Sequence, residues 1–329
     1  MSADGAIRLL SERDVRAVGL SLADTIALIE QVYLLDAQGR AEVPMKLGVH
    51  PGKPNSFLHA MPAWVDGACA LGMKWVSYFP GNSTQRLADL TAIIILNEPD
   101  HGAPVCIMEG MHVTLLRTAA CAAVAVKHIL PAPPKSLGLI GCGGLGRWTL
   151  RMMLTAFPTI RNVCVASRTE ASRVAFCAGM ERASAASLTP VAEARRAAEG
   201  MDVVVSSIPP GPDRPVHAGW LSPGSIFIPL DILNSWRDDV LTVATRVVSD
   251  DPAGFASRLQ EKRPGALASI KASVSLQGIL AGSVPKAKPG ERTFAVICGI
   301  ASTDVIVACE IYRRACAAGR GQMFAMREA

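Results

Sequence analysis

The sequence lacks the patterns that mark metal centres and membrane spans. Its nine cysteines include no C-x-x-C pair, and its six histidines form neither H-x-x-x-H nor H-E-x-x-H. Because metal-binding motifs recur at fixed short spacings, we expect no metal, and we expect the cysteines to be reduced and buried. No apolar run reaches the roughly 18 residues of a membrane span, and the run at residues 118–126 ends at Lys127 and His128.

Concentrated charge is also missing. The net charge of +5 is spread over 329 residues, and the nearest approach to a basic cluster, Arg313, Arg314 and Arg320, is short and interrupted. Nucleic-acid binding depends on a basic surface and is therefore not expected. Residues 12–16 carry four charges where a secretory signal would be apolar. We therefore expect a cytoplasmic protein with no membrane partner.

The sequence contains a glycine motif typical of a ligand-binding turn. Residues 139–146 read Leu-Ile-Gly-Cys-Gly-Gly-Leu-Gly, an apolar run that ends in the spacing G-x-G-x-x-G. Such glycines let a strand turn sharply into a helix while the backbone approaches a pyrophosphate, which the helix N-terminus stabilises. The alternative is a glycine-rich turn with no ligand. The residues expected to bind a dinucleotide here are Gly141, Gly143, Gly144, Leu145 and Gly146.

The segments around this motif alternate between strand and helix patterns. Apolar runs typical of buried strands occupy residues 135–140, 163–167, 202–208, 225–230 and 246–248. This alternation predicts an α/β fold with a Rossmann-type, doubly wound parallel sheet. The N-terminal part has a different character, because short extended runs are separated there by prolines, and it predicts a mixed α+β domain.

The choice of cofactor is set at the end of the second strand of such a sheet. An acidic side chain there binds the ribose hydroxyl of NAD, and a basic one accepts the 2′-phosphate of NADP. This strand is followed by Ser167, Arg168 and Thr169, and a guanidinium can pair with a phosphate through two parallel hydrogen bonds. We therefore predict that these three residues bind NADP. If Arg168 is only a solvated surface charge, the cofactor is NAD.

Three cations lie in apolar or proline-bounded surroundings. They are Lys46 in Pro-Met-Lys-Leu, Lys74 in Leu-Gly-Met-Lys-Trp-Val, and Arg117 in Leu-Leu-Arg-Thr-Ala-Ala. A charge in such a run either reaches out to water or is held for an anion, and the second interpretation predicts a small anionic substrate. Asp231 follows the strand at residues 225–230 and would lie where ligands of parallel sheets bind. Its alternative is a helix cap or a turn aspartate.

These residues belong to longer motifs that resemble the ornithine cyclodeaminase and mu-crystallin family. The motifs are Met-Pro-Ala at residues 61–63, Gly-Met-Lys-Trp-Val-Ser at 72–77, Phe-Pro-Gly-Asn at 79–82, Gly-Ala-Pro at 102–104, Met-Glu-Gly at 108–110, Thr-Leu-Leu-Arg-Thr-Ala-Ala at 114–120 and Cys-Gly-Ile-Ala-Ser-Thr-Asp at 298–304. The resemblance covers nearly the whole chain. The lysine and Arg-Thr-Ala-Ala motifs are more specific than the glycines.

The resemblance implies a homodimeric enzyme that uses NAD(P) on amino acids or imines, as cyclodeaminases, alanine dehydrogenases and ketimine reductases do. It implies that Arg117 holds the substrate carboxylate, helped by Lys46 in place of a family arginine. Lys74 would lie beside the reacting carbon, and Asp231 would move protons at the substrate nitrogen. Further positions expected to contact the cofactor are Thr118, Ser207 and Ile208.

Two domains are expected, because 329 residues exceed the usual size of one domain. Consecutive prolines at residues 131–134 disfavour helix and stiffen a connection, so the boundary is placed there. Residues 1–130 would form the substrate-binding and dimerisation domain, completed by a C-terminal helix over residues 303–329. Residues 131–302 would form the dinucleotide-binding domain.

The surroundings of Asp231 depart from the family pattern. Residues 229–237 read Pro-Leu-Asp-Ile-Leu-Asn-Ser-Trp-Arg, without the glycine-rich segment and Pro-Gly-Lys of true ornithine cyclodeaminases and mu-crystallins, which argues against ornithine as substrate. We expect an NAD(P)H-dependent oxidoreductase that reduces an imino acid to an amino acid, or catalyses the reverse reaction. The alternatives are an ammonia-lyase that uses NAD catalytically and a non-catalytic NADPH-binding protein.

Overall fold

The computed structural model describes residues 6–181, 185–211, 213–270 and 273–326. The chain forms two compact units, one comprising Met1–Arg117 and Ile300–Ala329 and the other Thr118–Gly299. The first change of unit falls within helix α3 (Met111–Ile129) and the second just before helix α10 (Ala301–Ala317). The sequence placed these two boundaries at residues 130/131 and 302/303.

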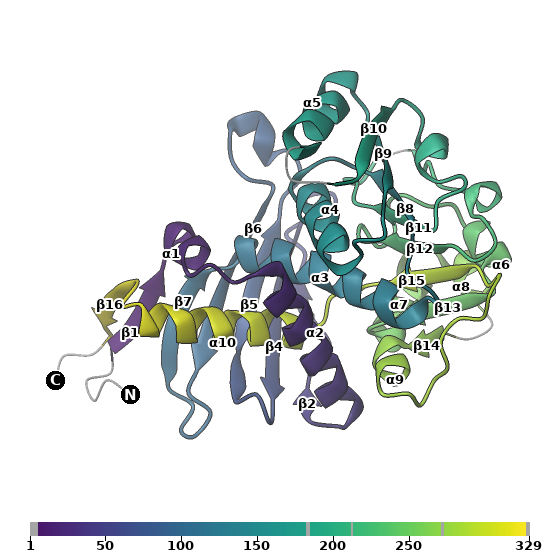
Figure 1. The fold of residues 1–329 in the computed structure, drawn as a ribbon. Coiled ribbons are helices and arrows are strands. Elements are labelled where there is room, and N and C mark those ends of the chain that lie inside the picture. Colours follow the sequence, from purple (N-terminus) through teal and green to yellow (C-terminus); the bar gives the residue numbers. More distant parts are fainter. Residues whose placement is uncertain (1–5, 182–184, 212, 271–272, 327–329) are drawn as a thin grey trace. The chain divides into compact units, whose positions relative to one another are not determined.

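The first unit contains an eight-stranded mixed sheet in the order β16-β1-β7-β6-β5-β4-β2, with β3 paired to β4 (Figure 1). Strands β1 and β7 are parallel, and the other neighbours are antiparallel. The strands are β1 (Ala6–Leu10), β2 (Ala41–Glu42), β3 (Leu47–Val49), β4 (Phe57–Val65), β5 (Ala70–Tyr78), β6 (Leu90–Asn97), β7 (Pro104–Glu109) and β16 (Gln322–Ala325).

Helices cover one face of this sheet. Helix α10 contacts β4, β5 and β6, while α2 (Leu22–Ala37) packs on α10 and β4, and the short α1 is Glu12–Ala17 (Figure 1). The hydroxyl of Ser21 accepts a hydrogen bond from the Asp24 N–H at 3.0 Å and so begins α2. The helix expected over residues 303–329 ends at Ala317, because Gly319 and Gly321 turn the chain with φ of 61° and 87°, and a strand, β16, follows it.

The second unit contains an eight-stranded sheet in the order β10-β9-β8-β11-β12-β15-β13-β14, in which every pairing is parallel. The chain runs from β8 outward to β9 and β10 and then returns to β11 on the other side of β8. The order therefore reverses between β8 and β11, which is where ligands of doubly wound sheets bind. The Rossmann-type α/β fold expected from the sequence is confirmed.

The strands of this unit agree with the apolar runs of the sequence where those runs are long. They are β8 (Ser136–Ile140), β9 (Asn162–Ala166), β10 (Ser187–Val191), β11 (Val203–Ser206), β12 (Ile226–Pro229), β13 (Arg246–Ser249), β14 (Ser273–Ser275) and β15 (Thr293–Val296). The helices are α4 (Gly144–Ala156), α5 (Glu170–Glu181), α6 (Val240–Val243), α7 (Pro252–Lys262), α8 (Pro264–Leu267) and α9 (Leu276–Leu280). The sequence did not reveal β10, β14 and β15, which are short or carry polar residues.

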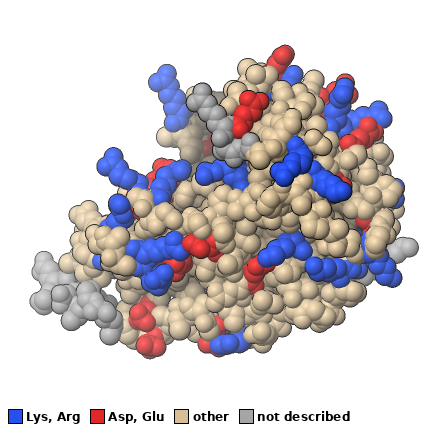
Figure 2. Space-filling model, in the orientation of Figure 1, with Lys and Arg blue, Asp and Glu red and all other residues tan. Residues whose placement is uncertain are grey.

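The cysteines and the surface charges were also the subject of expectations from the sequence. All nine cysteines are described, and none forms a disulfide, but Cys69 and Cys316 are exposed, so the expectation of buried thiols is wrong for these two. Lysine and arginine are interspersed with aspartate and glutamate on the face shown in Figure 2. Within the described ranges, no helix combines the length and apolar character that crossing a membrane requires.

Candidate functional site

Lys74 lies in the middle of β5, on the side of the sheet that α10 covers. Successive side chains of a strand point to opposite faces, so Lys74 points inward while its neighbour Trp75 points outward. Across the sheet Lys74 pairs with Met61 on β4 and Ile94 on β6, both of which are buried. Only 2% of Lys74 is exposed. An ionisable amino group is therefore enclosed in an apolar layer, and its charged form requires a counter-charge.

Asp304 supplies that counter-charge from the first turn of α10. Its Oδ2 lies 2.8 Å from Lys74 Nζ, and its Oδ1 lies 2.9 Å from Arg117 Nε. Arg117 belongs to α3 and is also buried, and Asp304 is 0% exposed. One carboxylate thus holds two cations that come from two different elements. The structure brings together two of the three predicted cations around an acid that the sequence analysis did not single out.

The charges of this cluster shift the pKa of each member. Burial is the main influence that lowers the pKa of Lys74, to about 7, with a contribution from the charge of Arg117 and against the raising effect of Asp304. Burial alone would raise the pKa of Asp304, but Arg117, Lys74 and Lys46 together lower it. Asp304 is therefore ionised at neutral pH, whereas Lys74 titrates near neutral pH.

Lys46, which precedes β3, is near enough to act on the same cluster. Its charge lowers the pKa of both Lys74 and Asp304. Two cations therefore bind a single buried carboxylate, and the charge of a third acts on it. When Lys74 is protonated, the cluster carries an excess of two positive charges, which suits a small anion such as a substrate carboxylate.

The glycine motif forms the turn between β8 and α4. Gly141 has a φ of 114°, and a Cβ there would lie 2.5 Å from the carbonyl oxygen of Ser207. A Cβ at Gly146 would lie 2.4 Å from the carbonyl oxygen of Gly141, so side chains are excluded at both positions. A Cβ at Gly143 would meet nothing within 4 Å. The first and third glycines are therefore required by the fold, and the second leaves open space.

This turn has the properties that a dinucleotide needs. Gly143 is the N-cap residue of α4 and has no side chain to cap the helix. The N–H groups of Gly144, Leu145 and Gly146 cannot bond within the helix, and a helix N-terminus stabilises phosphate charge. Beside the turn, the Ser207 N–H donates to the Ile140 carbonyl at 2.8 Å. The residues present therefore fit a dinucleotide pyrophosphate.

The segment after β9 carries the residues predicted to select the cofactor. The Thr169 hydroxyl accepts from the Ser172 N–H at 3.3 Å, so Thr169 caps α5, and the Ser167 hydroxyl donates to the Thr169 carbonyl at 3.0 Å. Arg168 lies between them and is exposed. Arg173, one turn into α5, donates to the Ser167 carbonyl. The loop is ordered by its hydroxyl groups, while Arg168 extends from it.

Asp231 lies in the turn that follows β12, and its carboxylate is well supplied with hydrogen bonds. Its Oδ2 accepts from the Ile208 N–H at 3.1 Å, and its Oδ1 accepts from the Ser235 hydroxyl at 2.9 Å. Burial raises the pKa of Asp231, and these hydrogen bonds oppose that effect. The side chain therefore ties the loop after β11 to the turn after β12, as a turn aspartate does. Ile208, predicted to contact the cofactor, contributes its N–H to this link.

The turn of Asp231 contains a residue with an unusual backbone conformation. Ile232 has a φ of 60°, which is strained for a β-branched residue. Thr118 lies on α3, one residue after Arg117. The sequence missed Asp304, although it is the single acid in a long apolar stretch, the same signal that marked Lys74 and Arg117.

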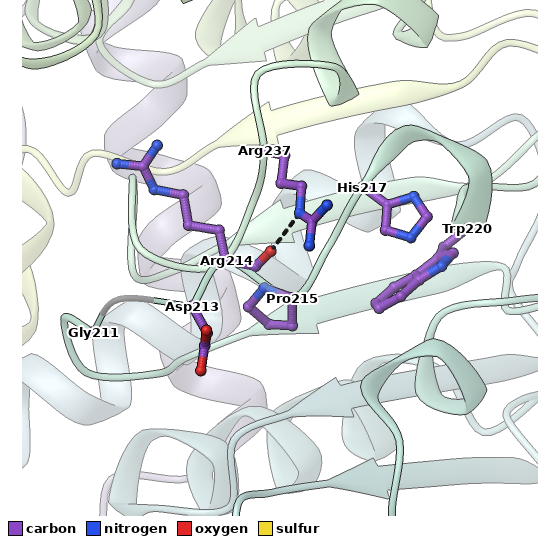
Figure 3. A pocket seen from close by; sticks show the side chains of 7 residues that line it. All are labelled: Gly211, Asp213, Arg214, Pro215, His217, Trp220 and Arg237. Carbon is purple, nitrogen blue, oxygen red and sulfur yellow. Dashed lines mark hydrogen bonds between the residues drawn. The ribbon is translucent and has the colours of Figure 1, made fainter.

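A separate pocket of about 810 Å³ lies in the second unit (Figure 3). The Arg237 guanidinium donates from Nε to the Arg214 carbonyl at 3.1 Å, and the His217 ring lies 4.3 Å from that of Trp220. None of the described residues that line it was predicted as a site residue. The lining consists of Gly211, Asp213, Arg214, Pro215, His217, Trp220 and Arg237.

Comparison with known proteins finds similarity over most of the chain. The chain is 30% identical over 307 residues to nodulation efficiency protein NfeD of Rhizobium meliloti, which covers 93% of this chain and 94% of that protein. It is 30% identical over 220 residues to an alanine dehydrogenase of Archaeoglobus fulgidus, covering 66% of this chain and 64% of that protein. The structure of Delta(1)-pyrroline-2-carboxylate reductase from Thermococcus litoralis, in complex with NADH and L-proline, matches with a TM-score of 0.85 and 26% identity, covering 96% and 99% of the two chains.

The family match covers most of the chain. Residues 8–318 match the ornithine cyclodeaminase/mu-crystallin family. That range includes the glycine turn, the cation cluster and every strand except β16 and the first residues of β1, and it agrees with the resemblance seen in the sequence motifs. The chain therefore belongs to the ornithine cyclodeaminase/mu-crystallin family.

Proposed function

We propose that the protein is an NAD(P)H-dependent oxidoreductase that reduces an imino acid to an amino acid, or catalyses the reverse dehydrogenation. The observation that carries the proposal is the buried cluster in which Lys74 and Arg117 share Asp304. A buried excess of positive charge is costly unless an anion completes it. A substrate carboxylate is such an anion, and both imino and amino acids carry one.

Roles within the cluster follow from its chemistry. Arg117 uses Nε for Asp304, and a guanidinium has five N–H donors in all, so it suits a carboxylate as a second acceptor. Lys46 adds a further positive charge that acts on the cluster. Lys74 lies beside the reacting carbon and polarises it as a cation. Positioning and charge neutralisation are thus the contribution of this unit.

The cofactor completes the proposal. We assign Gly141, Gly143, Gly144, Leu145 and Gly146 to the pyrophosphate, with Thr118, Ser207 and Ile208 as further contacts. When bound, the nicotinamide supplies a hydride to the substrate carbon or takes one from it. Similarity to the T. litoralis reductase, described in complex with NADH and L-proline, supports both the cofactor class and a substrate of this type.

Asp231 is our candidate for proton transfer at the substrate nitrogen. Its support is its place after β12, at the carboxyl edge of the parallel sheet, and the pKa that burial raises. Its hydrogen bonds to Ile208 and Ser235 also suit a purely structural role in the turn. Replacement by asparagine separates the two roles, because an amide keeps part of the hydrogen bonding and cannot carry the proton.

NADP is the cofactor we favour. Arg168 is exposed directly after β9, where a guanidinium can pair with the 2′-phosphate. Ser167 and Thr169 flank it: the Thr169 hydroxyl can donate to the same phosphate, and the Ser167 hydroxyl orders the loop by donating to the Thr169 carbonyl. NAD is the alternative, and the two are distinguished by a prediction below.

The outer face of the first sheet is our candidate for a homodimer interface. Leu47, Ala60, Trp75 and Ile93 lie opposite one another on β3, β4, β5 and β6. Leu47 is 71% exposed, Trp75 38% and Ile93 43%. A contiguous apolar row across four strands marks a protein interface more often than a free surface. A second copy of the chain, placed on this face, would cover it.

The main experiment measures turnover. With NAD(P)H and a cyclic imino acid such as Δ1-pyrroline-2-carboxylate, or keto acids with amines, we expect stoichiometric loss of absorbance at ~340 nm, the reduced-nicotinamide band. Arg117→Met and Lys74→Met should each lower kcat/KM by about 30-fold or more, since a lost charged anchor costs about 2 kcal/mol. Arg40→Met, which breaks a surface pair with Asp66, is the control and should retain wild-type kinetics.

Other outcomes of this assay would contradict the proposal. Ammonia release from an amino acid without lasting change in absorbance would identify a cyclodeaminase-type lyase. Tight NADPH binding without turnover over the whole panel would identify a binding protein. Values of kcat/KM within about threefold of wild type for both variants would remove the cluster from the mechanism.

The glycine turn gives a prediction on cofactor binding. Gly146→Ala places a methyl group against the Gly141 carbonyl, so the turn must open, and we expect NADPH affinity to fall about tenfold or more. Gly265→Ala is the control, because its Cβ would meet no atom within 4 Å. Fluorescence titration with NADPH measures both. Equal affinity of the two variants would contradict the assignment of the pyrophosphate to this turn.

The choice of cofactor depends on one side chain. Arg168→Ala should raise KM for NADPH about tenfold or more and leave KM for NADH unchanged, because only NADPH carries the phosphate that the guanidinium binds. Arg161→Ala is the matched control, because Arg161 lies directly before the first residue of β9 and Arg168 lies beyond its last. A wild-type enzyme that prefers NADH, or a variant that changes both constants equally, would show that Arg168 does not read the phosphate.

The interface proposal predicts a change of mass. Ile93→Lys places a charge at the β6 end of the apolar row, next to Trp75, so the dimer should dissociate and the mass from light scattering should fall to about half. Val174→Lys changes another exposed apolar residue, on α5, and should leave the mass unchanged. A monomeric wild-type protein, or an Ile93→Lys variant with wild-type mass, would contradict this interface.

A further inference from the structure

We infer that Asp304 is a positioning residue for the proposed reaction: its carboxylate holds Lys74 and Arg117 in a fixed geometry. The inference rests on the proposed function and extends it from the two cations to the acid on α10 that joins them. Asp304 acts through the two cations and does not itself contact the reacting atoms.

The geometry separates the two oxygens of Asp304 between two partners. Oδ2 takes Lys74 Nζ at 2.8 Å and Oδ1 takes Arg117 Nε at 2.9 Å. The three side chains come from β5, α3 and α10, and each is buried. A carboxylate engaged at both oxygens cannot rotate without breaking a charge-assisted hydrogen bond. The positions of both cationic groups are therefore fixed by one acid.

This arrangement is more than burial of a counter-ion. Charged groups cost free energy when they are removed from water, and apolar side chains of similar volume fill such a space as well or better. Because Lys46 adds a third positive charge to the cluster, Asp304 does not neutralise it. The triad therefore leaves a positive site whose shape is set in advance, as binding of a carboxylate requires.

The groups around Lys74 act on its proton in opposite directions. Arg117 and Lys46 disfavour the charged lysine, and Asp304 favours it. On the same face of the sheet, β6 contributes the apolar Ile94 and β4 contributes Met61, with the titratable His59 diagonally across. Asp304 is thus the acid that keeps Lys74 protonated near neutral pH.

The test is the pH dependence of the reaction. If protonated Lys74 is the active form, kcat/KM falls as the pH rises through its pKa, about 7 in the wild type. Asp304→Asn removes the negative charge and lowers that pKa, so the alkaline limb should move to lower pH by about 1 to 3 units. KM for the imino acid should also rise about tenfold or more, since Arg117 loses its anchor.

Two further variants make the result specific. Glu310→Gln removes one negative charge from the same helix, where it pairs with Arg313 and Arg314 at the surface, and should leave the profile unchanged. Asp304→Glu keeps the charge and moves the carboxylate by one methylene, so the alkaline limb should stay and KM should rise. A folded Asp304→Asn variant with the wild-type pH profile and KM would overturn the inference. If that variant does not fold, a wild-type KM in Asp304→Glu would overturn it instead.

Binding measurements keep this test independent of turnover. NADPH fluorescence reports whether each variant retains its dinucleotide unit. Calorimetry with pyrrole-2-carboxylate, a planar carboxylate probe, should show an affinity that decreases as the pH rises. In Asp304→Asn this decrease should begin at a lower pH than in wild type. If the wild type turns over no imino acid but this shift is seen, the proposed function fails and the role of Asp304 stands. If turnover is seen but neither the profile nor the binding shifts, only the role of Asp304 fails.

Discussion

The carboxylate of Asp304 lies between two cations that the fold encloses. Without it, the two positive charges of Lys74 and Arg117 would be buried with no counter-charge between them. Each would then destabilise the charged form of the other. The three side chains come from strand β5, helix α3 and helix α10. The cluster of the first unit forms only where these three elements meet. The excess charge that remains suits an anion, and on that ground we propose that the cluster binds the substrate carboxylate.

A different constraint shapes the second unit. At the turn after β8, backbone carbonyls approach Gly141 and Gly146 so closely that a side chain has no room, and the second glycine faces open space. The same turn places a helix N-terminus at the reversal of strand order, where phosphate charge is favoured. The imino-acid reduction that we propose needs two properties in one chain, a site for the substrate carboxylate and a turn that binds the dinucleotide.

Much of this organisation could be read from the sequence. The glycine spacing predicted the turn, and unexplained charges in apolar runs marked Lys74 and Arg117. Asp304 carries the same signal, but its pairing with these cations could not be found from local patterns, because it lies 230 positions from Lys74 and 187 from Arg117. The contacts of Asp231 with Ile208 and Ser235 depend likewise on two loops that only the folded sheet brings together. Short strands such as β14 and β16 have no periodic signal and exist because a longer neighbour offers its edge.

We propose above all that the cation cluster receives the carboxylate of the substrate. A crystal structure with NADPH and pyrrole-2-carboxylate would test this without reliance on turnover. The carboxylate should lie within hydrogen-bond distance of Arg117 and Lys74, with Asp304 still joined to both. A carboxylate bound instead in the pocket lined by Arg214 and Arg237, with the cluster unchanged, would contradict it.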